Sequence, residues 1–407
     1  MLLWSKKKIK NYEIAYEEYQ PIIFSSSTQR IENVFGYMSS DYRGFINLNR
    51  EQLFTLIKDN RFDCFNLFYV YKNQITPLEF FRNIFDLCKI ANEKDCKMNL
   101  LIVQETKNKL DNCYISSIIG FANSLIKENH SINIKLLNMS NINIDSLHHL
   151  YSYLFESIEN EFKYDVTNNK LYVKRIRKYS GSYNFMPIKN QGVYVIIGGG
   201  IISRKIAQKI KSYGGLPIIL SRKKVKEYNS YILDARNYNL LSNVFKDIVK
   251  KYDSIDGIFN LAAITKDKLF YFKEYEEFLE VLNTKALTTI NIIRCVSENK
   301  FFTDFLVNFS SLVSVFGNIG QTDYSMANRF LDNACYLKSP YIKKIRTVNW
   351  PYWKDGGMRL SNNQIGKMIE ETKQHPISDE DALNILFGLE AIDLTGNEII
   401  FLKNTLK

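Results

Sequence analysis

Along the first 178 residues, hydrophobic patterns typical of strands alternate with hydrophobic patterns typical of helices. Apolar runs at 62–71, 100–103 and 132–137 are typical of buried strands. Residues 115–127 carry apolar side chains at three- and four-residue steps, which predicts an amphipathic helix. At 161–176, apolar and polar residues alternate on both sides of a Thr-Asn-Asn turn, which predicts a β-hairpin. Strand and helix therefore alternate in this half.

The alternation is more regular after residue 192. The predicted strands are 193–197, 217–221, 231–233, 257–261, 305–309, 346–349 and 398–402, and the predicted helices are 203–213, 238–251, 275–298 and 324–337. Such alternation predicts an α/β fold with a doubly wound parallel sheet of the Rossmann type.

A break in periodicity separates the two series. Residues 179–192 contain two glycines and a proline and follow neither period. We place the domain junction there, with one domain at 1–190 and a second, chemistry-bearing domain at 191–407.

Composition and charge narrow the class of protein. Of the 407 residues, 45% are hydrophobic and 24% are charged, which is ordinary for a globular protein and excludes disorder as the main state. The net charge of +11 permits a polyanionic partner, but the lysines and arginines are scattered, so we expect no nucleic-acid binding. Without a signal peptide or a long apolar run, we expect a cytoplasmic protein that contacts no membrane.

The cysteines give no sign of a disulfide or metal site. None of the six is paired at a short spacing or stands beside one of the four histidines. They predict reduced core thiols and no bound metal.

A glycine-rich turn follows the strand at 193–197. The segment Gly-Gly-Gly-Ile-Ile-Ser at 198–203 is one substitution from the G-x-G-x-x-G dinucleotide fingerprint. Gly198 would allow the tight turn, and Gly200 would let a pyrophosphate approach the helix N-terminus. The expected cofactor residues here are Gly198, Gly199, Gly200 and Ser203. The alternative interpretation is a turn without a ligand.

The next strand ends in Ser221-Arg222-Lys223. An acidic residue at this place selects NAD, whereas cations favour the 2′-phosphate of NADPH. The two cations Arg222 and Lys223 therefore predict NADPH, with Ser221 and Arg222 as the expected cofactor residues, and a solvated basic loop is the alternative.

A second group of residues carries the candidate chemistry. Ser311 ends a predicted strand, and Tyr324 and Asn328 lie one turn apart on the following helix. Lys285 lies on the preceding long helix. A phenol with its usual pKa near ~10 is a poor acid, but a nearby ammonium lowers that pKa. Tyr324 could then protonate an alkoxide formed by hydride addition, with Ser311 holding the carbonyl oxygen and Asn328 positioning Lys285 or a relay water.

These residues lie in stretches that resemble a known family. Residues 309–328 read FSSLVSVFGNIGQTDYSMAN, 257–263 read GIFNLAA, and 349–358 read NWPYWKDGGM. They resemble the ketoreductase domains of modular polyketide synthases, a branch of the short-chain dehydrogenase/reductase superfamily in which the lysine and asparagine exchange positions. The stretch at 349–358 is most similar to synthases whose acyltransferase acts in trans. Residues 1–178 resemble the family's structural subdomain, a truncated Rossmann-like unit without a cofactor site.

The resemblance implies a reaction and its partners. It implies NADPH-dependent reduction of a β-ketoacyl thioester, carried by the phosphopantetheine arm of acyl carrier protein. It also implies other polyketide synthase domains as partners, and a self-contained monomer, either free-standing or excised from a larger synthase. The net charge of +11 could steer an acidic carrier.

The resemblance also assigns residues that contact cofactor and substrate. Residues 264–267 stand where many members have a Leu-Asp-Asp motif, and Asp267 matches its last aspartate. Phe316 stands where a tryptophan marks members with the opposite facial selectivity. Both imply a D-β-hydroxy product, and Met326 in place of proline implies no α-epimerisation. A solvated loop carboxylate is the alternative for Asp267. Further residues expected from the resemblance are Asp234 and Ala262 at the cofactor, and Gln321 and Met358 at the substrate, beside a lid at 359–378.

Two departures from the family affect the cofactor half. The glycine loop is one residue short, so Ile201 takes the place of the glycine nearest the pyrophosphate, where it would collide or need an unfavourable φ. The short interval between Ser221 and Asp234 predicts that the family's helix there is missing and Asp234 is less firmly placed.

Three functions therefore remain open from the sequence. The first is the carrier-dependent ketoreductase. The second is a non-catalytic pseudo-ketoreductase scaffold that no longer binds cofactor, and the third is a reductase for small free carbonyl compounds. Cofactor binding separates the first from the second, and carrier dependence separates it from the third.

Overall fold

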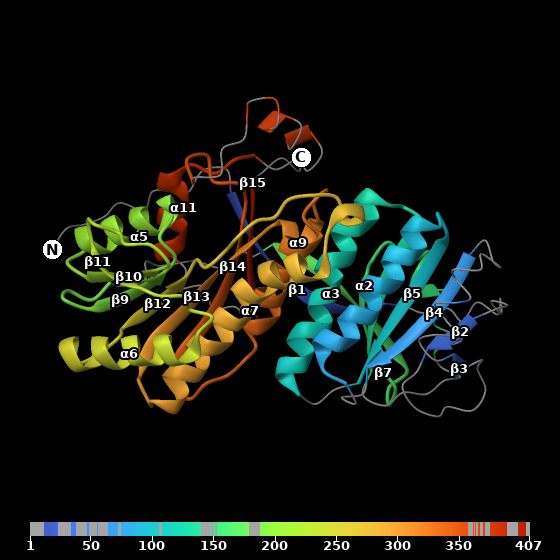
Figure 1. Cartoon of the computed structure of the whole chain (residues 1–407), viewed down its shortest axis with the longest axis horizontal. Coiled ribbons are helices and arrows are strands. Elements are labelled where there is room, and N and C mark those ends of the chain that lie inside the picture. The colour runs from blue at the N-terminus through green and yellow to red at the C-terminus, as the bar shows by residue number, and fades with distance from the viewer. Residues whose placement is uncertain are drawn as a thin grey trace.

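The computed structural model describes residues 12–22, 34–37, 47–48, 55, 64–71, 75–105, 108–139, 147, 150, 153–178, 188–356, 361, 363, 365–366, 369–370, 375–388 and 398–403. Within these ranges, one 15-stranded sheet runs the length of an elongated molecule (Figure 1). The α/β fold predicted from the sequence is confirmed.

The second half of the chain forms a doubly wound sheet. Its strands and helices are β9 (Val193–Ile197), α5 (Ile201–Ser212), β10 (Leu216–Ser221), β11 (Asn229–Ile232), α6 (Tyr238–Tyr252), β12 (Gly257–Asn260), η1 (Phe270–Phe272), α7 (Tyr275–Glu298), β13 (Thr303–Ser311), α8 (Val313–Phe316), α9 (Thr322–Ala334), β14 (Ile342–Trp350), α11 (Asp379–Gly388) and β15 (Glu398–Lys403). The strands are parallel in the order β11-β10-β9-β12-β13-β14-β15. The order reverses between β9 and β12, so a ligand crevice is expected at the carboxyl ends of these strands.

The first half forms a smaller alternating unit. Its elements are β1 (Tyr12–Ile22), β2 (Val34–Tyr37), β3 (Asn47–Leu48), β4 (Cys64–Tyr71), α2 (Pro77–Glu93), β5 (Lys97–Gln104), α3 (Lys109–Glu128), β6 (Ile132–Met139), β7 (Glu161–Asp165) and β8 (Lys170–Lys178). Strands β4 to β7 are parallel, and β7 and β8 form the predicted antiparallel hairpin.

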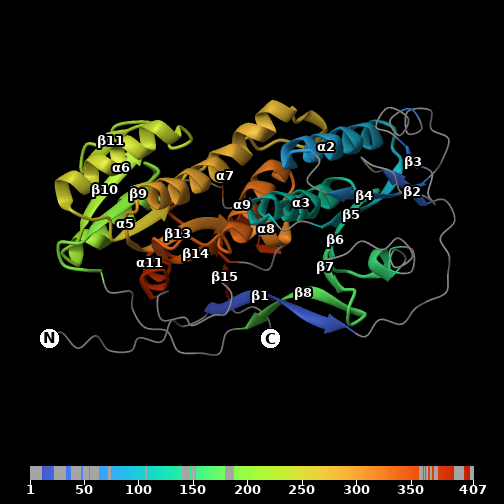
Figure 2. The same ribbon diagram turned by 90° about the horizontal axis from the view of Figure 1, so that it is seen from below.

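The first strand of the chain joins the two halves. Strand β1 pairs antiparallel with β8 on one side and with β15, from the far end of the sequence, on the other. Figure 2 shows β1 and β8 side by side beneath the helices. The division at residue 190 remains a prediction, and the sheet itself is continuous across it.

Helices from both halves of the chain pack together at the centre of the molecule. Helix α9 lies between α7 and α3 in both views, and one apolar cluster includes side chains from all three helices (Figures 1 and 2). The ring of Phe121 on α3 lies 5.9 Å from that of Phe278 on α7, and Tyr114 on α3 lies 4.6 Å from Phe330 on α9. The helix that carries Tyr324 is therefore packed against the first half of the chain.

Three smaller expectations can be compared with the structure. Residues 222–228, all of which are described, contain no helix, as the short interval before Asp234 predicted. The cysteines with described side chains are buried, as core thiols would be. No helix in the described ranges is both long and apolar enough to span a bilayer.

Candidate active site

A single cavity of about 720 Å³ lies at the carboxyl ends of the parallel strands. It joins the glycine loop to the candidate catalytic residues. The predicted residues that line it are Gly198, Gly199, Gly200, Ser203, Ser221, Arg222, Asp234, Ala262, Asp267, Lys285, Ser311, Phe316, Gln321 and Tyr324. Met358 and half of the predicted lid at 359–378 lie outside the described residues.

The glycine loop has the backbone that a tight strand-to-helix turn needs. Gly198 has a φ of 120°, which is the region that favours glycine. Gly200 is the N-cap of α5, and a Cβ built there would meet no atom within 4 Å. This backbone is therefore open toward the cavity, as the approach of a pyrophosphate would require.

The expected backbone strain at Ile201 is wrong. Ile201 is the first residue of α5 and is not among the residues with positive φ. Its side chain is 44% exposed. Ile201 therefore has helical backbone geometry rather than that of a strained turn.

The N-terminus of α5 is suited to an anion. Among the described residues, no side chain caps it, and its first turn holds no acidic residue. Unpaired N–H groups and the helix dipole favour a phosphate there. Ser203 is buried against the sheet side of the helix, where its small side chain replaces the third glycine of the fingerprint.

Two arginines face the adenosine end of the cavity. Arg222 lines it after β10, and Arg236 lines it beside Asp234. The Arg236 guanidinium donates from Nε to Oδ1 of Asp234 at 3.0 Å and from Nη2 to Oδ2 at 2.6 Å. This pairing lowers the pKa of Asp234. Sequence reasoning missed Arg236, although the signal was present in its position just after a strand end.

Lys285 is the buried cation of the site. Its side chain is 3% exposed on α7, and Nζ donates to the carbonyl of Phe309 at 2.8 Å. Nζ also lies 5.7 Å from the centre of the Tyr324 ring. Burial lowers the pKa of Lys285 to about 7, and the negative charge of Asp332 opposes that shift.

The pKa of Tyr324 moves in the opposite direction to the one expected from the sequence. Burial raises it, with the Asn328 side chain opposing the shift. The reason is geometric, because the Lys285 ammonium donates to a backbone carbonyl and lies over the ring. A raised pKa makes the Tyr324 phenol a weaker acid than the sequence argument expected.

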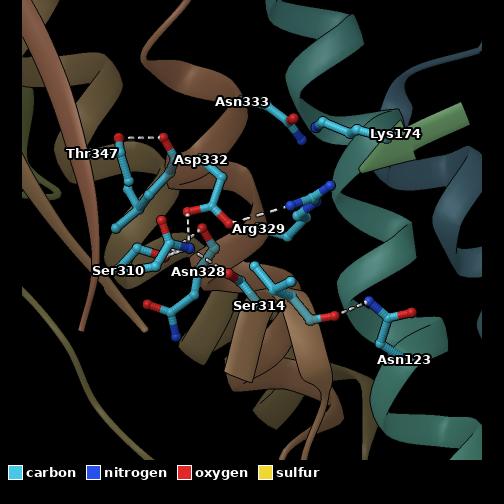
Figure 3. Close-up of polar contacts among 12 residues, drawn as sticks. Asn123, Lys174, Ser310, Ser314, Asn328, Arg329, Asp332, Asn333 and Thr347 are labelled. Atoms are coloured by element: carbon cyan, nitrogen blue, oxygen red, sulfur yellow. Dashed lines mark hydrogen bonds and ion pairs between the residues drawn. The ribbon is translucent and has the colours of Figure 1, made fainter. Parts of the chain in front are cut away.

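Asn328 lies behind the cavity and is fully buried (Figure 3). Its Nδ2 donates to the backbone carbonyl of Tyr324 at 2.8 Å, and Ser310 Oγ donates to the Asn328 carbonyl at 3.2 Å. Its Oδ1 has no hydrogen-bond partner among the described residues. A free acceptor at this place suits the predicted contact with a lysine or a water.

The substrate end of the cavity is formed by two loops. Ser311 ends β13, and its Oγ accepts from the backbone N–H of Val313 at 3.3 Å. Gln321 Nε2 donates to Oδ2 of Asp267 at 2.8 Å, so these two predicted residues are in contact.

Helix α3 holds the segment that carries Phe316. Asn123 Nδ2 donates to the carbonyl of Val315 at 2.8 Å (Figure 3). Lys127 Nζ donates to the carbonyl of Gly317 at 3.1 Å.

Four residues that line the cavity lie in the stretch at 349–358, which resembles the family, but the sequence predicted no role for them. They are Trp350, the last residue of β14, and Pro351, Tyr352 and Trp353, which follow it. Their signal is a run of aromatic residues directly after a parallel strand, where the ligand crevice of such folds lies.

Comparison with known proteins shows what this chain is similar to. Residues 192–355 match the family model described as KR domain. The chain is 28% identical over 241 residues to polyketide synthase PksN of Bacillus subtilis, covering 53% of this chain and 4% of the relative. It is 25% identical over 308 residues to PksM of the same organism, covering 70% and 7%.

The fold extends the likeness over almost the whole chain. A ketoreductase domain from the bacillaene assembly line superposes with a TM-score of 0.77 at 18% identity, covering 97% of this chain and 98% of that one. Both Bacillus relatives are named as polyketide synthases. The chain spans only a small part of the curated synthases that it matches.

Proposed function

We propose that this chain is a ketoreductase that uses NADPH to reduce a β-ketoacyl thioester on acyl carrier protein to a D-β-hydroxyacyl thioester. The observation that carries this proposal is the single cavity shared by the glycine loop and the Lys285, Ser311 and Tyr324 side chains. A bound nicotinamide would supply the hydride for the β-carbon.

Each catalytic side chain has a role that its surroundings support. The Ser311 hydroxyl donates a hydrogen bond to the β-carbonyl oxygen, where negative charge develops. Tyr324 gives its proton to that oxygen. The Lys285 ammonium then stabilises the phenolate that remains, and Asn328 holds Tyr324 through its backbone carbonyl.

The preference for NADPH rests on Arg222. It is exposed at the adenosine end of the cavity, after the strand where an acidic residue would select NAD. Arg222→Ala should weaken NADPH binding about ten-fold or more and leave NADH binding nearly unchanged, since a charge-assisted hydrogen bond contributes ~1.5–3 kcal/mol.

Nicotinamide fluorescence measures both affinities. Lys226→Ala is the matched control, because Lys226 is exposed in the same loop but does not line the cavity. Equal losses for NADPH and NADH would contradict the assignment of Arg222.

The D configuration rests on Asp267 and Phe316, which line the same cavity as Tyr324. Chiral analysis of the reduced thioester tests it, and an L-alcohol would contradict it. Reduction of free ketones but not of thioesters would instead favour a reductase for small carbonyl compounds.

One observation favours the second candidate, a scaffold without cofactor. The carboxylate of Asp234, expected near the adenine, is engaged by Arg236. Absence of NADPH binding by the intact chain would select this candidate.

A further inference from the structure

The loop that carries Asp267 is held on both sides of that residue. On one side, Lys273 Nζ donates to the carbonyl of Lys266 at 2.8 Å. On the other, the backbone N–H of Lys268 donates to the carbonyl of Gly320 at 3.0 Å. The position of Asp267 along the cavity wall is therefore fixed by its two neighbours.

The first of these anchors is part of a buried ion pair. Lys273 Nζ lies 2.8 Å from Oδ2 of Asp323, and each side chain is 1% exposed. Asp323 Oδ1 accepts from the backbone N–H of Tyr324 at 2.8 Å. One ion pair thus joins the loop around Asp267 to the residue that precedes the proton donor.

The second anchor is tied to the first half of the chain. Glu128, at the end of α3, accepts from the backbone N–H groups of Gly320 and Phe270. Gly320 has a φ of 78°, a conformation that favours glycine. Both loops at the substrate end therefore share anchors that lie behind the cavity.

The ion pair between Lys273 and Asp323 is expected to contribute little to the stability of the fold. Removing two charges from water costs free energy that their attraction only partly offsets, so apolar residues of similar volume often stabilise as well. What the pair does supply is a fixed geometry between the Asp267–Gln321 contact and Tyr324.

We propose that Lys273 and Asp323 are positioning residues that set the facial selectivity of the reduction. They hold Asp267 and Gln321 at a fixed place relative to Tyr324, so that the substrate presents one face of its carbonyl. This inference rests on the proposed function.

The test removes the charge from each partner in the intact protein. Lys273→Met and Asp323→Asn are compared with the wild type on an N-acetylcysteamine β-ketoacyl thioester. We expect the ratio of the two alcohol enantiomers to change by about ten-fold, which corresponds to ~1.4 kcal/mol between competing transition states. NADPH affinity should stay unchanged, because neither residue lines the cofactor part of the cavity.

Two controls separate positioning from general stability. Lys273→Arg keeps the charge and should retain the wild-type ratio. Lys189→Met removes the cation of another ion pair, 2.7 Å from Asp256, at the amino ends of the parallel strands and so opposite the cavity, and should leave the ratio unchanged.

An unchanged ratio in folded Lys273→Met or Asp323→Asn protein overturns the inference. If neither variant folds, the pair has a structural role alone, and the inference is overturned as well. A wild-type protein that binds NADPH but reduces no thioester contradicts the proposed function instead, so the two failures are distinguishable.

Discussion

At the scale of single residues, Lys285 shows a conflict between stability and chemistry. An ammonium is needed beside Tyr324, yet burial lowers the pKa of Lys285 from 10.5 to about 7. Between these values the unfolded chain binds one proton more than the folded protein, so the free energy of unfolding rises with pH there. The cost of burying this charge is present in full below about pH 7.

Lys285→Met should therefore stabilise the protein while abolishing reduction. We expect a gain on the order of 1 kcal/mol in the free energy of unfolding at pH 7 or below, smaller at higher pH, because one pKa unit corresponds to about 1.4 kcal/mol. Urea unfolding of both proteins at several pH values measures it. A variant that is less stable than the wild type at pH 6 would contradict this account.

The same pKa predicts the pH profile of the wild-type enzyme. If the ammonium form of Lys285 is required, kcat/KM for reduction should fall above about pH 7, since the pKa of that group is about 7. Steady-state rates of reduction, measured at saturating cofactor over a range of pH, test this prediction. A profile that stays flat to pH 9 would show that neutral Lys285 suffices.

Residue spacing predicted that Tyr324 and Ser311 would lie together, because they follow a strand end and begin the next helix, and both line the cavity. Their catalytic roles stay a prediction. Arg236 was missed although its partner Asp234 is only two residues away. Ser310 was missed because its contact with the Asn328 carbonyl depends on how separate elements meet. The pKa direction of Tyr324 was missed for the same reason, since it depends on where the Lys285 ammonium points.

At the scale of elements, the approach of α3 to α9 fixes the position of Tyr324. A Cβ on Gly120 would lie 2.5 Å from the Ser325 carbonyl oxygen and 2.8 Å from the Arg329 Cβ, both on α9. Only a residue without a side chain permits this distance between the helices.

Gly120→Ala should destabilise the protein and lower its activity. Overpacking costs about 1–3 kcal/mol and outweighs the ~1 kcal/mol that alanine gains in a helix. Gly200→Ala is the matched control, since a Cβ there meets nothing within 4 Å. It should change stability by less than about 0.5 kcal/mol but weaken NADPH binding. Equal melting temperatures for the two variants would contradict this packing argument.

Periodicity predicted the elements to within a few residues, because buried strands and amphipathic helices have distinct patterns. It placed α7 at Tyr275–Glu298 and β9 at Val193–Ile197, as observed. It missed the helix start at Ile201, because the family pattern placed a turn where the shortened loop already begins α5.

At the scale of the whole molecule, the two halves are one structure. Strand β1 lies between β8 and β15, and the apolar cluster around α9 includes residues of α2 and α3. Sequence patterns could not predict this, since pairing between distant strands leaves no local periodicity.

A fragment of residues 188–407 should therefore fail to fold cooperatively. It would expose the face of α9 that α3 covers, and burial of apolar surface is the main source of stability. Circular dichroism during thermal unfolding measures this. A cooperative transition at the melting temperature of the full chain would show that the halves are independent.

The measurement that tests the central claim most directly is a titration of the intact protein with NADPH by nicotinamide fluorescence, with NADH alongside. It requires no assumption about the acyl chain and probes the half of the cavity that departs from the family. We predict micromolar binding with NADPH preferred over NADH. No binding at millimolar NADPH would contradict the reductase and leave the scaffold as the function of this chain.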